Sequence, residues 1–111
     1  KLNLKIDKNI IIIDPLDYLS FLKLMNESKI ILTDSGGIQE EAAIIGVPCI
    51  TLRTSTERQI TLIKKVNILA GYNKKKIINA VKKFEHKKIL KVKDFGVGQA
   101  TKIIYRELLK I

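Results

Sequence analysis

Residues 33–41, Thr-Asp-Ser-Gly-Gly-Ile-Gln-Glu-Glu, form the segment of this sequence best suited to chemistry. They follow an apolar run and open a predicted helix, so free N–H groups and the positive helix end would face a ligand at the carboxyl edge of a sheet. Gly36 and Gly37 allow close backbone approach, and Ser35 adds a hydroxyl donor. The pattern favours a phosphate site, although a tight turn whose glycines serve geometry alone has the same signature.

A second polar loop, residues 53–58, follows the next predicted strand and should lie beside the first loop at the same sheet edge. Thr56 precedes Gln59 by three residues, a capping-box pattern that predicts a helix opening near Glu57 with Arg58 in its first turn. A guanidinium there can bind a diphosphate through two parallel hydrogen bonds. The alternative is a surface ion pair, which contributes about 0–1 kcal/mol.

The elements that must position these loops alternate between strand and helix, which predicts an α/β fold with a parallel sheet and helices on both faces. The isoleucine run 10–13 reads as a strand buried on both faces. Four strands are few for such a sheet, so the sequence predicts part of a Rossmann-like domain. The expected strands are residues 10–13, 29–33, 49–52 and 67–70. Helices are expected from Asp17 to Asn26, from Gly37 to Ile45, from Glu57 onward, from Asn73 to Phe84 and from Gly98 to Lys110, and Gly46 is expected to end the second of them.

Apolar positions on two of these helices predict core residues. Those on the first helix are Leu19, Leu22, Leu24 and Met25, and those on the last are Ala100, Ile103, Ile104, Leu108 and Ile111.

Composition excludes several classes of protein. The 111 residues are 46% hydrophobic and 29% charged, which is ordinary globular composition, and no apolar run is long enough to span a bilayer. The net charge of +10 comes mostly from lysines that lack aromatic partners, so we do not expect a nucleic-acid binder. Cys49 is the only cysteine and His86 the only histidine, which excludes an intramolecular disulfide and cysteine-rich zinc modules.

Longer motifs add a resemblance to a known family. Residues 14–18, 32–41, 56–58 and 95–100 resemble, in one register, the C-terminal part of non-hydrolysing UDP-N-acetylglucosamine 2-epimerases. The resemblance implies the C-terminal half of a glycosyltransferase-B-type fold, with residues 1–111 as an incomplete UDP-binding domain and the N-terminal domain absent. It implies interconversion of UDP-GlcNAc and UDP-ManNAc by elimination and re-addition of UDP, without cofactor or metal, in the cytoplasm, and a role in polysaccharide biosynthesis.

The same resemblance implies the site. Ser35, Gly36, Gly37 and Arg58 would hold the diphosphate and Glu41 the ribose hydroxyls, while Phe21 would lie near the uracil. Ile60 and Lys65 stand where the family's pattern has an acidic residue and a glycine, which leaves open whether Arg58 still reaches phosphate.

No catalytic residue is assigned, because the family's acid/base carboxylates belong to the N-terminal domain and its functional histidine to strands that precede this sequence. His86 does not match that histidine. The chain alone is therefore expected to be inactive. Asp14 and Asp34 are interpreted as turn residues and Cys49 as a buried, inert thiol.

Two other readings stay open: a non-catalytic nucleotide-sugar-binding or regulatory module, and half of a related UDP-sugar glycosyltransferase. Whether the chain is a split gene product, a truncated sequence or a decayed copy is also open. The expected partner is a UDP-sugar, and no association with a membrane is expected. A separate chain that carries the N-terminal domain, and a homo-oligomer, are left open.

Overall fold

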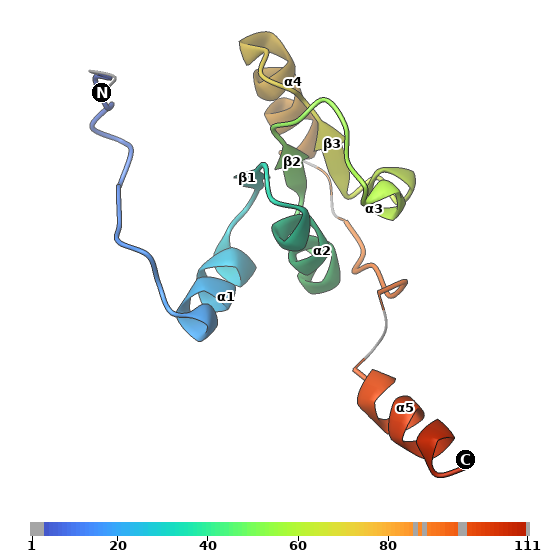
Figure 1. The fold of residues 1–111 in the computed structure, drawn as a ribbon. Helices are drawn as coiled ribbons and strands as arrows, with labels where there is room; N and C mark the ends of the chain where they lie inside the picture. The colour runs from blue at the N-terminus through green and yellow to red at the C-terminus, as the bar shows by residue number, and fades with distance from the viewer. Residues whose placement is uncertain (1–3, 86, 88, 96–97, 111) are drawn as a thin grey trace.

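A three-stranded parallel sheet forms the centre of the computed structural model, which describes residues 4–85, 87, 89–95 and 98–110. Its order is β1 (Ile31–Thr33), β2 (Cys49–Thr51) and β3 (Asn67–Leu69). The strands are joined by α2 (Gly36–Ile45) and α3 (Gln59–Ile63) (Figure 1). The expected α/β class and parallel sheet are confirmed.

Helices cover both faces of this sheet because successive strand residues point to opposite sides. Ile50 is fully buried in the cluster that α4 (Lys74–Phe84) closes with Phe84. Its neighbour Cys49 faces the other way, into a cluster formed with α2 and α1 (Tyr18–Glu27). Figure 1 shows α4 and α2 on opposite sides of β2.

Three helix boundaries lie where local chemistry predicts them. The Asp17 carboxylate accepts a hydrogen bond from the Ser20 N–H at 2.7 Å and caps α1. The Asn73 side chain accepts from the Lys76 N–H at 3.1 Å and caps α4. Gly46 ends α2 in the left-handed conformation, with φ of +82°. A cap involves neighbouring residues only, which is why the sequence predicts it correctly.

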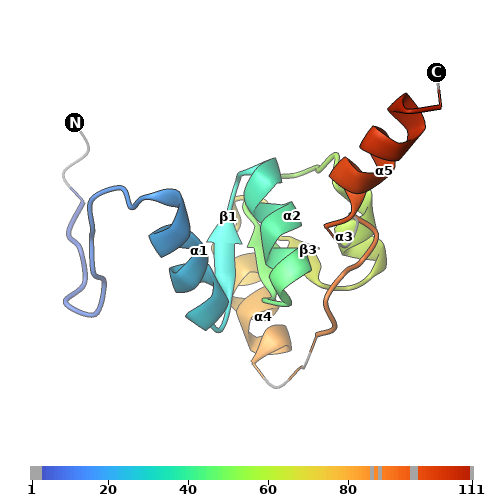
Figure 2. The same ribbon diagram turned by 90° about the horizontal axis from the view of Figure 1, so that it is seen from below.

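The predicted strand at residues 10–13 is wrong. The four isoleucines are extended, but their side chains are 55–85% exposed, and within the described chain no strand pairs with them. A strand buried on both faces needs neighbours and covering helices. This N-terminal segment instead runs away from the sheet beyond α1 (Figure 2).

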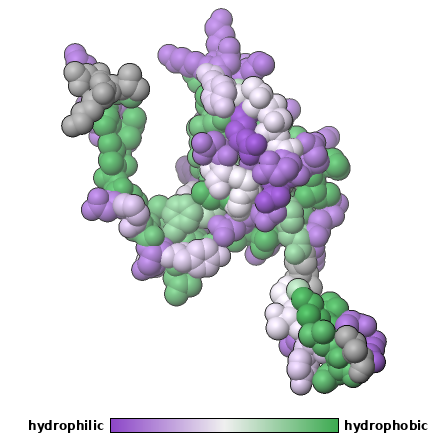
Figure 3. Space-filling model, viewed as in Figure 1, coloured by the Kyte–Doolittle hydropathy of each residue, from purple (hydrophilic) through white to green (hydrophobic). Residues whose placement is uncertain are grey.

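Several predicted core positions are also wrong. On α1 only Met25 is buried, whereas Leu19 and Leu24 are exposed, because one side of the helix contacts α2. The apolar residues of α5 (Ala100–Leu108) are exposed as well, since this helix projects from the rest of the chain. Figure 3 shows their hydrophobic side chains on its surface. Ile111 lies outside the described residues.

The two projecting ends give the molecule principal extents of 60 × 31 × 27 Å. Between α4 and α5 the chain runs back along α2, where the buried Val92 donates its N–H to the Ala43 carbonyl at 2.9 Å. None of the helices in the described ranges has the length and apolarity that a bilayer crossing requires.

Candidate functional site

The turn between β1 and α2 presents two free backbone donors. Ser35 caps α2, its Oγ accepting the Ile38 N–H at 3.4 Å, and its own N–H donates to Thr33 Oγ1 at 3.1 Å. The N–H groups of Gly36 and Gly37, the first two residues of the helix, have no acceptor within the described chain. Two amides at the positive end of a ten-residue helix are therefore available to an anion.

The loop at residues 56–58 lies against this turn, as the sequence predicts. A Cβ added to Gly36 would overlap the Glu57 carboxylate and lie 3.7 Å from Nη2 of Arg58. Glycine at position 36 therefore leaves room for the Glu57 side chain. The arrangement brings the Arg58 guanidinium to the beginning of α2.

Arg58 also forms an ion pair at this position. Its Nε lies 2.7 Å from Oε1 of Glu40, and each of the two side chains is 34% exposed. The N–H of that Nε is not aligned for a hydrogen bond, so the contact is electrostatic. The ion pair that the sequence offers as the alternative to a phosphate-binding role of Arg58 is thus present. The Nη2 end of the guanidinium nevertheless lies near Gly36.

The predicted helix boundary beside Arg58 is wrong. α3 begins at Gln59, with Arg58 as its N-cap residue and no side-chain cap. The capping box fails because the Thr56 hydroxyl donates to Oε1 of Gln39 and accepts the N–H of Arg58 instead. Ile60, the departure from the family's pattern, is partly buried against the cluster that contains Ala43.

The two residues assigned to the nucleoside lie on neighbouring helices. Glu41 on α2 accepts a hydrogen bond from the Tyr18 hydroxyl on α1 at 3.1 Å, and this bond to a carboxylate raises the pKa of Tyr18. Tyr18 is 62% exposed. Phe21 is partly buried against the cluster of Met25 and Cys49. No local pattern predicts the Tyr18–Glu41 contact, because 23 residues separate the partners.

Side chains of both charges lie beside this turn. Oε2 of Glu57 lies 3.3 Å from Nη1 of Arg53. A hydrogen bond from its own backbone, followed by the charges of Arg53 and Arg58, lowers the pKa of Glu57. Glu57 is therefore ionised at neutral pH beside Gly36, where it would repel a phosphate.

Of the remaining candidates, Asp34 belongs to this turn, next to Ser35 in the chain. Burial raises the pKa of Cys49 to about 11, and the thiol is 1% exposed, which confirms the predicted buried thiol. Asp14 and Asp34 are exposed. His86 and residues 96–97 of the last motif lie outside the described residues.

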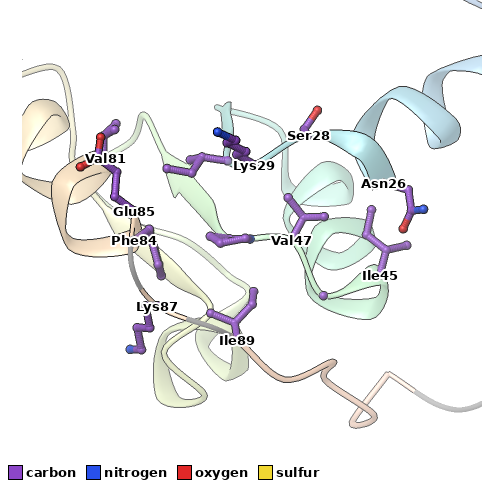
Figure 4. A pocket seen from close by; sticks show the side chains of 13 residues that line it. Asn26, Ser28, Lys29, Ile45, Val47, Val81, Phe84, Glu85, Lys87 and Ile89 are labelled. Carbon is purple, nitrogen blue, oxygen red and sulfur yellow. The ribbon is translucent and has the colours of Figure 1, made fainter.

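The largest cavity described lies at the opposite end of the sheet (Figure 4). Its volume is about 1120 Å³, and Lys29 and Val47, which precede β1 and β2, contribute to its lining together with Val81, Phe84 and Lys87. Ligands of open parallel sheets bind at the carboxyl ends of the strands, not at the amino ends. The candidate site is therefore the turn at Gly36 and not this cavity.

Known proteins share both sequence and fold with this chain. The family model described as UDP-N-acetylglucosamine 2-epimerase matches residues 1–109. The UDP-N-acetylglucosamine 2-epimerase of Methanocaldococcus jannaschii is 50% identical over 105 residues, 95% of this chain and 29% of that protein. The protein of the same name from Escherichia coli K12 is 47% identical over 67% of this chain and 20% of its own length.

Solved structures agree with the sequence comparison. The M. jannaschii UDP-GlcNAc 2-epimerase in complex with UDP-GlcNAc and UDP has a TM-score of 0.86 at 48% identity, over 95% of this chain and 29% of that one. The Neisseria meningitidis UDP-GlcNAc 2-epimerase bound to UDP-GlcNAc has a TM-score of 0.73 at 39% identity, over 89% of this chain and 29% of that one. This chain thus spans less than a third of these relatives, and the described sheet is part of a glycosyltransferase-B-type fold. The chain belongs to the UDP-N-acetylglucosamine 2-epimerase family.

Proposed function

We propose that this chain binds the UDP moiety of a nucleotide sugar such as UDP-GlcNAc at the turn that opens α2. The proposal is supported above all by the position of Arg58, whose guanidinium lies at the start of a helix where two N–H groups find no acceptor among the described residues. Amides at a helix N-terminus and a guanidinium both favour phosphate oxygens. Relatives with the same fold are described as bound to UDP-GlcNAc.

The proposed site divides between diphosphate and nucleoside. The amides of Gly36 and Gly37, the Ser35 hydroxyl and Arg58 bind the diphosphate. Glu41 accepts hydrogen bonds from the two ribose hydroxyls, and Tyr18 would orient that carboxylate. Phe21 is assigned to the uracil end, on the same helix as Tyr18.

The reaction proposed for the complete enzyme is interconversion of UDP-GlcNAc and UDP-ManNAc, with UDP eliminated and added back. In this scheme the Gly36 turn and Arg58 stabilise negative charge as it develops on the departing diphosphate. The acid and base are proposed to come from an N-terminal domain, in the same polypeptide or a separate chain. The 111-residue chain alone is then expected to form no UDP-ManNAc from UDP-GlcNAc, and measurable turnover by the pure chain would contradict this assignment.

Titration with UDP and uridine, followed by NMR or calorimetry, tests the site. UDP should bind with Kd weaker than about 0.1 mM, since contacts from the other side of the cleft are missing, and more tightly than uridine. Arg58→Ala should reduce the preference for UDP about tenfold, whereas Glu41→Ala should weaken both ligands alike, about fivefold.

Ionic strength provides the control for these titrations. The net charge of +10 attracts any phosphate, but that attraction decreases as salt is added. A preference for UDP that disappears in moderate salt, or equal binding of UDP and uridine, would contradict the proposed site.

A further inference from the structure

Polar side chains fill the space between α2, α3 and the two strands that precede and follow α3. Buried polar groups destabilise a fold unless they are hydrogen-bonded, so such a set in a small core needs a reason. Its members are each at most 4% exposed: Gln39, Thr51, Thr56, Thr61 and Asn67.

Asn67 on β3 holds this set together. Its Nδ2 donates to Oε1 of Gln39 at 3.2 Å and to Oγ1 of Thr61 at 3.0 Å. Its Oδ1 accepts from Oγ1 of Thr51, on the neighbouring strand, at 2.7 Å. Both donors of the amide are satisfied, so the orientation of the Asn67 side chain is fixed by its partners.

The same hydrogen bonds extend to the backbone of Arg58 from both sides. The Arg58 N–H donates to Thr56 Oγ1 at 3.0 Å, and its carbonyl accepts from Thr61 Oγ1 at 2.7 Å. The Thr56 hydroxyl in turn donates to Gln39 at 2.6 Å. Arg58 has φ of −92° and ψ of 56°, outside the helical and strand regions. Besides the two hydroxyls, the first turn of α3 also binds this backbone, since the Thr61 N–H donates to the Arg58 carbonyl at 3.0 Å.

We propose that Thr56 and Thr61 are positioning residues for Arg58. Their hydroxyls, which Gln39 and Asn67 orient, hold the peptide groups on either side of Arg58 and so present its guanidinium to the diphosphate. The functional part of this inference rests on the proposed UDP site. On this proposal the direction of Arg58 is set by buried hydrogen-bonding residues and not by Ile60.

A pair of variants at Thr61 separates the contribution of the hydroxyl group from that of side-chain packing. Thr61→Val removes the hydroxyl and keeps the volume, whereas Thr61→Ser keeps the hydroxyl and removes a methyl group. Thr101→Val, on exposed α5, is the matched control. The readouts are the Nε–Hε NMR resonance of Arg58 without ligand, which reports on its contact with Glu40, and the ratio of UDP to uridine affinity.

Thr61→Val is expected to shift the Arg58 resonance toward that of an exposed arginine and to lower the preference for UDP about threefold to tenfold. Thr61→Ser and Thr101→Val should keep both wild-type values. Where Thr61→Val does not fold, Thr56→Val and Thr56→Ser repeat the comparison on the other side of Arg58, in a loop.

Two results would overturn the proposal: wild-type behaviour of the valine variants, or equal loss in the serine variants, which would assign the effect to packing. If the wild-type chain does not prefer UDP to uridine, the proposed function fails. The Arg58 resonance still decides whether the threonine hydroxyls position this residue.

Discussion

Ile50 and Ile11 have the same side chain but opposite environments, with 0% and 85% of their surface exposed. Ile50 lies in the sheet region, residues 28–95, where α4 covers its side chain. Ile11 lies in one of the two arms, residues 4–17 and 99–110, for which the described chain supplies no cover. An apolar run therefore becomes part of the core only where other elements of the fold pack against it.

The candidate site follows the same division. The Gly36 turn and Arg58 lie wholly in the sheet region, and only Tyr18 and Phe21 come from α1. The arms contribute nothing to it, although they carry much of the exposed apolar surface (Figure 3). We therefore expect changes in the arms to leave the site unaffected, and changes around the Gly36 turn to affect it strongly.

The largest expected effect is on stability. Ile50→Ala should lower the free energy of unfolding by about 3 kcal/mol, because it leaves a cavity among Ala70, Ala80 and Phe84. Ile11→Ala should change it by less than about 0.5 kcal/mol, as exposed substitutions do. Urea unfolding followed by circular dichroism measures both. Equal destabilisation by the two variants would mean that the N-terminal arm packs against a core in solution.

Thiol reactivity provides the second contrast. Burial raises the pKa of Cys49 to about 11, so at pH 8 only about one molecule in a thousand carries the reactive thiolate. A cysteine introduced in the arm by Ile12→Cys should have an ordinary pKa and react more than about a hundredfold faster. Titration with a chromogenic disulfide measures both rates. Rapid labelling of Cys49 in the unmodified chain at pH 8 would show that the sheet region opens readily.

The parts of this fold that the sequence predicts are those determined locally. Asp17, Asn73 and Gly46 set helix boundaries through residues three or four positions away, and the adjacent glycines mark the turn between β1 and α2. Pairing of residues 10–13 with a sheet depends on chain far from that segment, so its apolar pattern gives a wrong prediction.

The site shows the same limit. The proximity of Arg58 to Gly36 follows from strand order and is predicted. The bonds that join Gln39 to Thr56 and Asn67 connect residues 17 and 28 positions apart, and no spacing rule indicates them. The fold class and the glycine turn are thus available from local patterns, whereas the polar side chains that bind the Arg58 backbone require the structure.

A smaller effect is expected where the sheet region itself contains a strained residue. Lys65 has φ of +58°, a conformation that costs a side chain about 1–2 kcal/mol, at the position where the family's pattern has glycine. Lys65→Gly should therefore raise the free energy of unfolding by up to about 1 kcal/mol, after the greater freedom of glycine in the unfolded chain is subtracted. Lys82→Gly, in the last turn of α4, is the control and should destabilise by about 0.5–1 kcal/mol. A loss of stability in Lys65→Gly would show that the positive φ is not strained here.

The smallest expected effect concerns the charge at the edge of the site. Glu57 lies against Gly36 and its pKa is lowered by its own backbone and by Arg53 and Arg58, so its negative charge is present throughout the neutral pH range. Glu57→Gln keeps the shape and removes the repulsion between this charge and a diphosphate.

Glu57→Gln should therefore tighten UDP binding about twofold to threefold at low salt, the size expected for an exposed charge, and leave uridine binding unchanged. The gain should shrink in moderate salt, because the interaction is screened. Glu85→Gln, at the far end of α4, makes the same change in net charge and should leave the ratio of UDP to uridine affinity unaltered. If Glu57→Gln instead weakens UDP binding, the carboxylate orients Arg53 and Arg58 and belongs to the binding residues.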